Sequence, residues 1–271
     1  MKFILKNKAF FHETSHNTVL SVRQACAVES LAFHNPHLSI YVLMANEVNS
    51  SHPIIRALRT YGNINLLQIQ LADYFSDTPL ENWYFCNSWR SGKYSTSHLS
   101  DALRFLTLYK YGGYYFDLDF VMLRSVSDHR NFVGLESKKT LAAGAMHADF
   151  QHPIFNQTIL EFRDTYNKTL WGHNGPLLIT RVLNRSCPNL HNCTTFNVLP
   201  TEIFYPVSYQ NWRTYFSTKL VSSFKWNKTV GVHVWNNLSK GEAVVKNSKQ
   251  VYAQLAMKNC PRVFNVSGAK F

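Results

Sequence analysis

Two aspartates separated by a single residue, Asp117 and Asp119, are the strongest candidates for chemistry in this sequence. The aromatic run 114–116 precedes them and predicts a buried strand that ends where the aspartates begin. Ligands of open parallel sheets bind at the carboxyl ends of the strands. Two carboxylates buried there need a partner, and a hard divalent cation such as Mn²⁺ or Mg²⁺ is the simplest one. The alternative is that the aspartates only cap a turn.

A second charged pair, Asp101 and Arg104, lies upstream in a segment with helical character. Because the two residues are three positions apart, they share one face of the helix. As a local surface ion pair they would contribute under about 1 kcal/mol to stability. The functional alternative is that Asp101 accepts hydrogen bonds from sugar hydroxyls while Arg104 binds a phosphate or the sugar.

The chain between these two pairs predicts how they are brought together. A helix over 100–109 ends at Gly112-Gly113, and the strand over 114–116 follows at once. Glycine just beyond a helix terminates it, so the chain returns within a few residues to the edge of the sheet. The sequence therefore places Asp101 and Arg104 near Asp117 and Asp119.

The remaining chain alternates between strand and helix patterns, which predicts one α/β domain with a parallel sheet and helices on both faces. The segment 76–98 is polar, aromatic and without a clear period, so we expect a long functional loop against which the acceptor binds. Strands are expected over 9–12, 38–44, 64–69, 114–116 and 230–235, and helices over 20–33, 53–61, 100–109, 153–166 and 176–185.

Composition narrows the classes of ligand. The chain of 271 residues is 45% hydrophobic and carries a formal charge of +12, so it is globular and attracts anions. The basic residues are scattered, without a basic run or a zinc-finger or RNA-binding signature, which argues against nucleic acid as a partner. Two explanations of the positive charge remain: it attracts a phosphorylated small molecule, or it is a solvated basic surface with no partner.

Cysteines and glycosylation sequons bear on the compartment. Of five cysteines, Cys187 and Cys193 flank a short polar loop and are candidates for a small disulfide, and the odd count leaves at least one thiol free or paired outside the chain. Eight Asn-x-Ser/Thr sequons favour a lumenal protein over a merely Asn-rich one. The sequence shows no secretory signal and no run of about 20 apolar residues that would span a membrane.

The segments 99–104 (LSDALR) and 108–120 (LYKYGGYYFDLDF) resemble the signature of the D-x-D sugar transferases. The outer motifs at 11–15 (FHETS), 23–30 (RQACAVES) and 232–236 (VHVWN) resemble the α1,4-galactosyltransferase family within that superfamily. The similarity extends over nearly the whole chain. It implies a GT-A fold, which is a Rossmann-like α/β arrangement of a single mixed sheet flanked by helices, together with a UDP-sugar donor and Mn²⁺ or Mg²⁺.

The resemblance also assigns roles by position. Asp101 and Arg104 correspond to the catalytic pair that holds the donor sugar. Asp117 corresponds to the residue near ribose and sugar, Asp119 to the principal metal ligand, and His233 to a C-terminal histidine that binds the metal or the diphosphate. The resemblance further implies that Asp117 and Asp119 both bind the nucleotide sugar and that Asp117 is a second metal ligand. A core histidine on a strand is the alternative reading of His233.

Further positions follow from the same likeness. Asn174-Gly175 resembles the loop that lines the donor pocket. Two departures are notable: family members often have Asn where Ala143 stands and Cys where His16 stands. Residues 1–125 are expected to form the nucleotide-sugar half and 126–271 the acceptor half with the histidine motif. Family members are type II Golgi membrane proteins, so we expect a Golgi lumenal domain whose membrane anchor is absent from this chain.

These expectations combine into one hypothesis. The protein is a retaining, metal-dependent glycosyltransferase that moves galactose or an N-acetylhexosamine from its UDP-sugar to a glycolipid or glycan in α1,4 linkage at the Golgi membrane. The first alternative is a relative that binds glycans or lipids and has lost catalysis. The second is a metal phosphohydrolase that uses the same carboxylates, although such enzymes normally cluster more His and Asp ligands.

Overall fold

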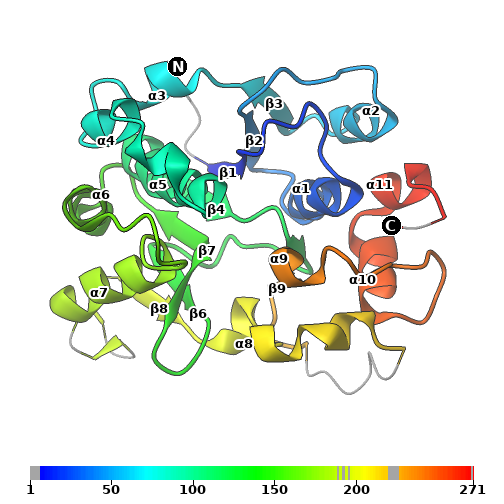
Figure 1. Cartoon of the computed structure of the whole chain (residues 1–271). Helices are drawn as coiled ribbons and strands as arrows, with labels where there is room; N and C mark the ends of the chain where they lie inside the picture. The colour runs from blue at the N-terminus through cyan, green and yellow to red at the C-terminus, as the bar shows by residue number, and fades with distance from the viewer. Residues whose placement is uncertain (1–6, 188, 191–192, 195, 219–225, 270) are drawn as a thin grey trace.

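A mixed sheet forms the centre of the molecule (Figure 1). The computed structural model describes residues 7–187, 189–190, 193–194, 196–218, 226–269 and 271. Within these residues the sheet has seven strands in the order β3-β2-β1-β4-β7-β6-β8. The strands are β1 (Lys8–Glu13), β2 (Ser39–Met44), β3 (Ile64–Gln68), β4 (Gly113–Phe116), β6 (Phe132–Leu135), β7 (Leu141–Ala148) and β8 (Asn197–Leu199).

The direction of the strands changes midway across the sheet. The strands β3, β2, β1 and β4 run parallel, as the alternating pattern predicted, but β7 pairs antiparallel with both β4 and β6. Both expected halves of the chain contribute strands to this one sheet. A separate two-stranded sheet pairs β5 (Phe120–Met122) antiparallel with β9 (Gly231–His233). The predicted strand over 230–235 is therefore real but shorter.

Helices cover both faces of the sheet, and each face has its own hydrophobic core (Figure 1). In β4, Tyr114 and Phe116 belong to one core and Tyr115 to the other, as alternation along a strand requires. One face carries α1 (Val22–His34), α2 (Pro53–Arg59), α10 (Val251–Asn259) and α11 (Pro261–Val266). The other carries α3 (Leu71–Phe75), α4 (Glu81–Phe85), α5 (Ser95–Tyr111), α6 (Pro153–Thr165) and α7 (Pro176–Ser186).

The predicted helices begin where local chemistry can satisfy their first N–H groups. Ser21 caps α1 and forms a reciprocal capping box with Gln24. His52 and His152 cap α2 and α6, and each ring accepts a hydrogen bond from the second residue after it. Proline follows both histidines as the first helical residue, a position where its missing N–H does no harm.

The prediction of a long irregular loop over 76–98 is wrong. This segment contains α4, the 3-10 helix η1 (Ser88–Ser91) and the first turn of α5. Trp83, Tyr84 and Trp89 are buried and stack on one another and on Phe75. Large aromatic rings gain the most from burial, and these three form helix-packing core here. The binding of the acceptor against this segment stays a prediction.

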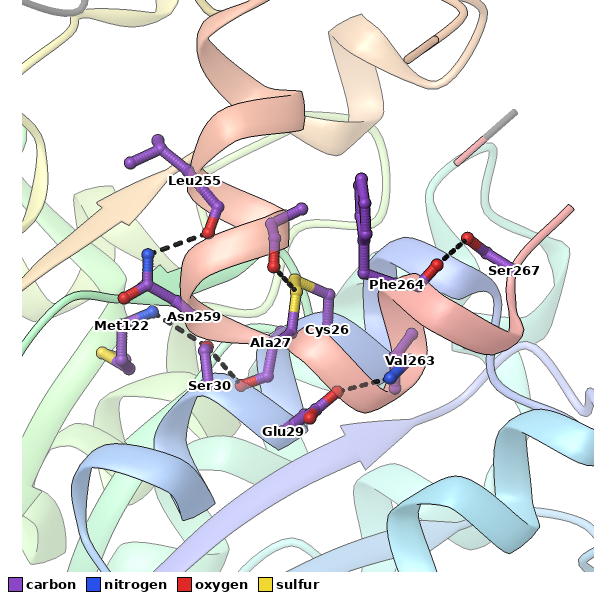
Figure 2. The surroundings of a disulfide bond; sticks show 12 residues. Cys26, Ala27, Glu29, Ser30, Met122, Leu255, Asn259, Val263, Phe264 and Ser267 are labelled. Atoms are coloured by element: carbon purple, nitrogen blue, oxygen red, sulfur yellow. Dashed lines mark hydrogen bonds between the residues drawn. A yellow bond between two sulfur atoms is a disulfide. The ribbon is translucent and has the colours of Figure 1, made fainter. Parts of the chain in front are cut away.

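The first and last helices are tied together beside the small sheet. A disulfide joins Cys26 of α1 to Cys260, which immediately follows α10 (Figure 2). The buried Glu29 carboxylate accepts hydrogen bonds from the backbone N–H of Arg262 and Val263 at the start of α11. Ser30 accepts a hydrogen bond from the N–H of Met122 in β5 (Figure 2). These contacts anchor the two-stranded sheet that carries His233.

Of the other three cysteines, two form a second disulfide and one is free. Cys187 and Cys193 form a disulfide, which confirms that predicted pair. The Cys26–Cys260 bridge was not predicted, because 234 positions separate the two residues in the sequence. Cys86 is exposed and free.

Among the helices in the described ranges, none combines the length and apolar character needed to cross a bilayer. The remaining short helices are α8 (Thr201–Phe204), α9 (Asn236–Ser239) and the 3-10 helix η3 (Tyr209–Phe216).

Candidate active site

The end of β4 and the small sheet bring Asp117, Asp119 and His233 together. The N–H of Asp117 donates to the carbonyl of Gly144 in β7 (2.8 Å), which fixes the chain just past β4. Three residues later β5 begins, and its Phe120 is paired with His233 of β9. Ligand atoms from Asp117, Asp119 and His233 all lie within 4.8 Å of one another. The alternative of two aspartates that merely cap a turn does not account for this convergence.

Asp119 and His233 are in direct contact. The Nε2 atom of His233 lies 2.9 Å from Oδ1 of Asp119 and 4.0 Å from Oδ2 of Asp117. The other oxygen of Asp119 accepts a hydrogen bond from the N–H of Asn236 (2.8 Å). Asp119 is thus held by two groups and presents its carboxylate towards His233.

The charges in this cluster shift its protonation. Burial lowers the pKa of His233, but the charge of Asp119 and the hydrogen bond to it outweigh burial and raise this pKa. Burial raises the pKa of Asp119, but the same partner and the N–H of Asn236 outweigh it and lower this pKa. Two carboxylates and one imidazole are a donor set that fits a divalent cation, with the cation taking the place of the proton on His233.

Arg104 joins α5 to the aspartates. Its Nη1 lies 3.2 Å from Oδ1 of Asp117 and donates to the carbonyl oxygen of Ala143 (2.9 Å), while Nη2 lies 3.4 Å from Oδ1 of Asp101. The side chains of Arg104 and Asp101 are only about a tenth exposed (10% and 9%). The interpretation of Asp101 and Arg104 as a surface ion pair is therefore wrong, and the pair belongs to the same charged group as Asp117.

Burial and charge act in opposite directions on the pKa of each member of the Asp101–Arg104 pair. Burial raises the pKa of Asp101 to about 6; Arg104 opposes this shift and Asp117 adds to it. Burial lowers the pKa of Arg104, but Asp117, Tyr115 and Asp101 outweigh it, so Arg104 stays charged. Asp101 is consequently a carboxyl group held close to its charged partner and poised to exchange a proton near neutral pH.

The loop before α7 contributes Gly175 to the site. A Cβ atom on Gly175 would lie 2.5 Å from Oδ1 of Asp101, so only glycine lets the loop approach that carboxylate. Asn174 is buried, and its amide accepts from the N–H of Asn167 (2.9 Å) and donates to the same residue's carbonyl (2.7 Å). The amide of Asn174 therefore fixes the 167–174 loop, and its contact with a donor sugar stays a prediction.

Ala143 acts in this site through its backbone. Its carbonyl receives Arg104, while its side chain is buried in the core beneath α5. The contact with Arg104 therefore does not depend on which side chain occupies position 143. The next residue, Gly144, is required to be small, because a Cβ there would lie 2.6 Å from Oδ2 of Asp117.

Sequence reasoning missed several residues around the aspartates. The hydroxyl of Tyr115 donates to Oδ1 of Asp117 (2.7 Å), and His12 lies against the ring of Tyr115 with centroids 5.1 Å apart. Tyr115 and Asp117 are two positions apart, so strand alternation puts their side chains on the same face. Their contact could therefore have been predicted from the sequence. Tyr205 and Glu136, which act electrostatically on His233 or the aspartates, lie in segments whose pattern predicted no element.

Comparison with known proteins shows which family this sequence resembles. Residues 21–139 match the family described as "Glycosyltransferase sugar-binding region containing DXD motif", and residues 147–267 match "Alpha 1,4-glycosyltransferase conserved region". Lactosylceramide 4-alpha-galactosyltransferase of Homo sapiens is 34% identical over 269 residues, covering 93% of this chain and 75% of that protein. Alpha-1,4-N-acetylglucosaminyltransferase of Homo sapiens is 28% identical, covering 94% of this chain and 78% of that protein.

Solved structures show the same fold. The glycosyltransferase GlyE of Streptococcus pneumoniae superposes with a TM-score of 0.54 at 15% identity, covering 96% of this chain and 62% of that one. The galactosyltransferase LgtC, solved with donor and acceptor sugar analogues, gives 0.50 at 13% identity and covers 96% of both chains. The mixed sheet with flanking helices is thus the predicted GT-A fold, and the chain belongs to the α1,4-glycosyltransferase family, whose D-x-D motif is Asp117-Leu118-Asp119.

Proposed function

We propose that the protein is a retaining, metal-dependent hexosyltransferase that moves galactose or an N-acetylhexosamine from its UDP-sugar to a glycolipid or glycan in α1,4 linkage. The observation that carries this proposal is the convergence of Asp117, Asp119 and His233 beside the buried Asp101–Arg104 pair. The activities named for the two human relatives, α1,4 transfer of galactose and of N-acetylglucosamine, support the reaction class.

Asp119 and His233, with Asp117 beside them, would hold Mn²⁺ or Mg²⁺. Such a cation, when bound, neutralises the diphosphate and makes it a better leaving group. Asp117 is also held by Arg104 and Tyr115, so its carboxylate is fixed for a second task, which we assign to the ribose and the donor sugar.

Asp101 and Arg104 would hold the donor sugar. Arg104 is anchored within α5 by Asp101 and by the carbonyl and hydroxyl of Ser100, and outside α5 by Asp117 and the carbonyl of Ala143. A guanidinium fixed in this way stabilises negative charge that develops on the departing phosphate without having to reorganise. The three aspartates of the site are already bonded to Arg104 or His233, so we favour front-face attack by the acceptor, with the leaving phosphate as its base, over a covalent intermediate.

The acceptor half, from residue 126 onwards, would supply the surface that contacts the glycolipid acceptor. The 167–175 loop, which places Gly175 beside Asp101, leaves Leu170 53% and Trp171 59% exposed. Trp is common where a protein meets a membrane or a sugar, because its ring is apolar and its N–H is polar. This surface and the sequons support action on glycosphingolipids at the lumenal face of the Golgi membrane.

A donor panel tests the proposal. Purified protein is incubated with UDP-galactose, UDP-N-acetylgalactosamine, UDP-N-acetylglucosamine and UDP-glucose, with lactosyl glycolipid present and with or without Mn²⁺. Release of UDP from one of these donors, dependent on Mn²⁺ and abolished in Asp119→Ala, is the expected result. UDP-sugar binding with no release from any donor would instead identify a glycan-binding relative without catalysis.

A further inference from the structure

Tyr205 is fitted into a slot on the opposite face of the sheet from Arg104. It directly follows α8, and its ring lies 5.5 Å from that of Phe120. A Cβ on Gly134 would lie 2.9 Å from Cε2 of this ring, and a Cβ on Gly144 would lie 3.1 Å from the hydroxyl. The two glycines of β6 and β7 therefore leave the space that the ring and hydroxyl fill.

The hydroxyl of Tyr205 ends beside Asp117 without a hydrogen-bond partner. Both this hydroxyl and Oδ2 of Asp117 lie close to the position that a Cβ on Gly144 would take, at 3.1 and 2.6 Å. The residue is 3% exposed, and its oxygen has no bonded partner among the residues that the structure places. A phenol carries its proton at neutral pH, so this buried hydroxyl is a hydrogen-bond donor. Leaving such a group unpaired costs about 1–3 kcal/mol, which points to a partner supplied by a ligand.

Glu136 faces the same space. It lies two positions beyond Gly134, and its N–H still pairs with the carbonyl of Thr140 across the hairpin, so its side chain points to the face of Tyr205. The side chain is half-buried, and within the described ranges its carboxylate has no hydrogen bond or ion pair. Glu136 acts electrostatically on both Tyr205 and His233, which places its charge near the site.

Different polar side chains thus approach Asp117 from the two faces of the sheet. Tyr115 and Asp101–Arg104 approach Asp117 from the face of α5, and the α5-side core includes Tyr115. Tyr205 belongs to the core on the opposite face. If Asp101 and Arg104 hold the donor sugar, the side of the site that carries Tyr205 and Glu136 is left for the acceptor sugar.

We propose that Tyr205 and Glu136 form the subsite for a hydroxyl of the acceptor sugar. This inference rests on the proposed transferase function, and it gives roles to two residues to which that function assigned none. A sugar hydroxyl both accepts and donates, and here the phenol would donate to it while the Glu136 carboxylate would accept from it. Paired in this way, both side chains gain the partners that the folded chain does not give them.

Single-atom and isosteric variants test the subsite. Tyr205→Phe and Glu136→Gln are compared with wild type in three assays: the KM for lactosyl glycolipid, the Kd for the UDP-sugar with Mn²⁺, and hydrolysis of the UDP-sugar without acceptor. We expect the acceptor KM to rise, or transfer to fall, by about tenfold or more, because a lost hydrogen bond in such a site is strongly discriminating. The donor Kd and donor hydrolysis should stay within about twofold of wild type, because each variant removes only an acceptor contact.

Two controls make the result specific. Tyr215→Phe removes another buried hydroxyl that has no partner within the described residues and whose pKa is raised by burial alone. Glu47→Gln neutralises an exposed carboxylate. Both should behave as wild type. An unchanged acceptor KM in both site variants, or a parallel loss of donor binding, overturns the subsite; a wild-type chain that releases no UDP from any donor contradicts the proposed function instead.

Discussion

Nη1 of Arg104 lies 3.2 Å from Oδ1 of Asp117, so a residue in the middle of α5 and the first aspartate of the D-x-D motif form a partly buried ion pair. This contact connects the donor-sugar pair to the metal ligands. It also depends on the planar shape of the guanidinium, because the same nitrogen reaches the carbonyl oxygen of Ala143.

Arg104→Lys should therefore lower kcat/KM by about 100-fold although it keeps the charge, since lysine cannot reproduce the fixed fork of donors. The matched control is Arg163→Lys, which alters an exposed pair with Asp164 and should leave activity unchanged. Steady-state kinetics of UDP release measure both. Full activity in Arg104→Lys would show that position 104 contributes only charge.

Gly175→Ala should inactivate the enzyme without unfolding it. The added methyl would sit 2.5 Å from Oδ1 of Asp101, so either the carboxylate or the loop must move. In Gly241→Ala the new Cβ would meet nothing within 4 Å, which makes this variant the control. We expect a loss of about 100-fold in turnover for the first variant, since a displacement of about 1 Å at a catalytic group has this effect. Equal activity in the two variants would contradict the placement of Gly175 beside Asp101.

The raised pKa of Asp101 predicts an unusual link between pH and stability. Burial raises this pKa from 3.8 to about 6, so between these values the folded chain binds more protons than the unfolded chain. The contribution of Asp101 to the free energy of unfolding therefore falls as pH rises through this window. Asp101→Asn should raise the thermal midpoint at pH 7, with a gain in the free energy of unfolding on the order of 1–3 kcal/mol. This gain should shrink to about half at pH 5 and go on falling towards pH 4.

Thermal melts of Asp101→Asn and wild type in EDTA, from about pH 4.5 to 7.5, measure this effect. Activity should be lost in the same variant, because the neutral amide no longer pairs with Arg104 or accepts from a sugar as a carboxylate does. A midpoint that drops by a constant amount at every pH would show instead that Asp101 stabilises the fold in its charged form.

The disulfide between Cys26 and Cys260 should account for a large share of stability. It joins positions 234 residues apart, and closing so long a loop restricts the unfolded chain strongly. Replacing both cysteines by alanine should lower the free energy of unfolding by about 2–5 kcal/mol, as chemical denaturation would measure. Cys86→Ser is the control, because Cys86 is exposed and free. A double variant as stable as this control would contradict the account.

The parallel half of the sheet was predictable because each of its strands and helices leaves a strong local pattern. The apolar run ending at Met44, the glycines after α5 and the capping signals of α2 and α6 all act within a few residues. The antiparallel pairing of β7 left no local pattern, because strand pairing depends on contacts between distant segments. The mixed sheet was predicted only through the family resemblance. The aromatic segment 76–98 was misjudged because composition does not show whether a ring faces solvent or core.

The candidate site divides in the same way. Asp101, Arg104, Asp117 and Asp119 lie within 19 consecutive positions, so one motif reveals them. His233 required either a family resemblance or the pairing of β9 with β5, which the sequence does not display. Tyr205 and Glu136 are visible only once the slot between Gly134 and Gly144 is known.

The central claim is that Asp119 and His233, with Asp117, hold the cation needed for sugar transfer. Titration of Mn²⁺ into the protein with UDP present, followed by electron paramagnetic resonance, tests it most directly in wild type and Asp119→Asn. We expect one tightly bound Mn²⁺ per wild-type chain and at least about a 100-fold weaker affinity in the variant, with sugar transfer lost in parallel. Equal Mn²⁺ affinity and equal transfer in the two proteins would contradict it.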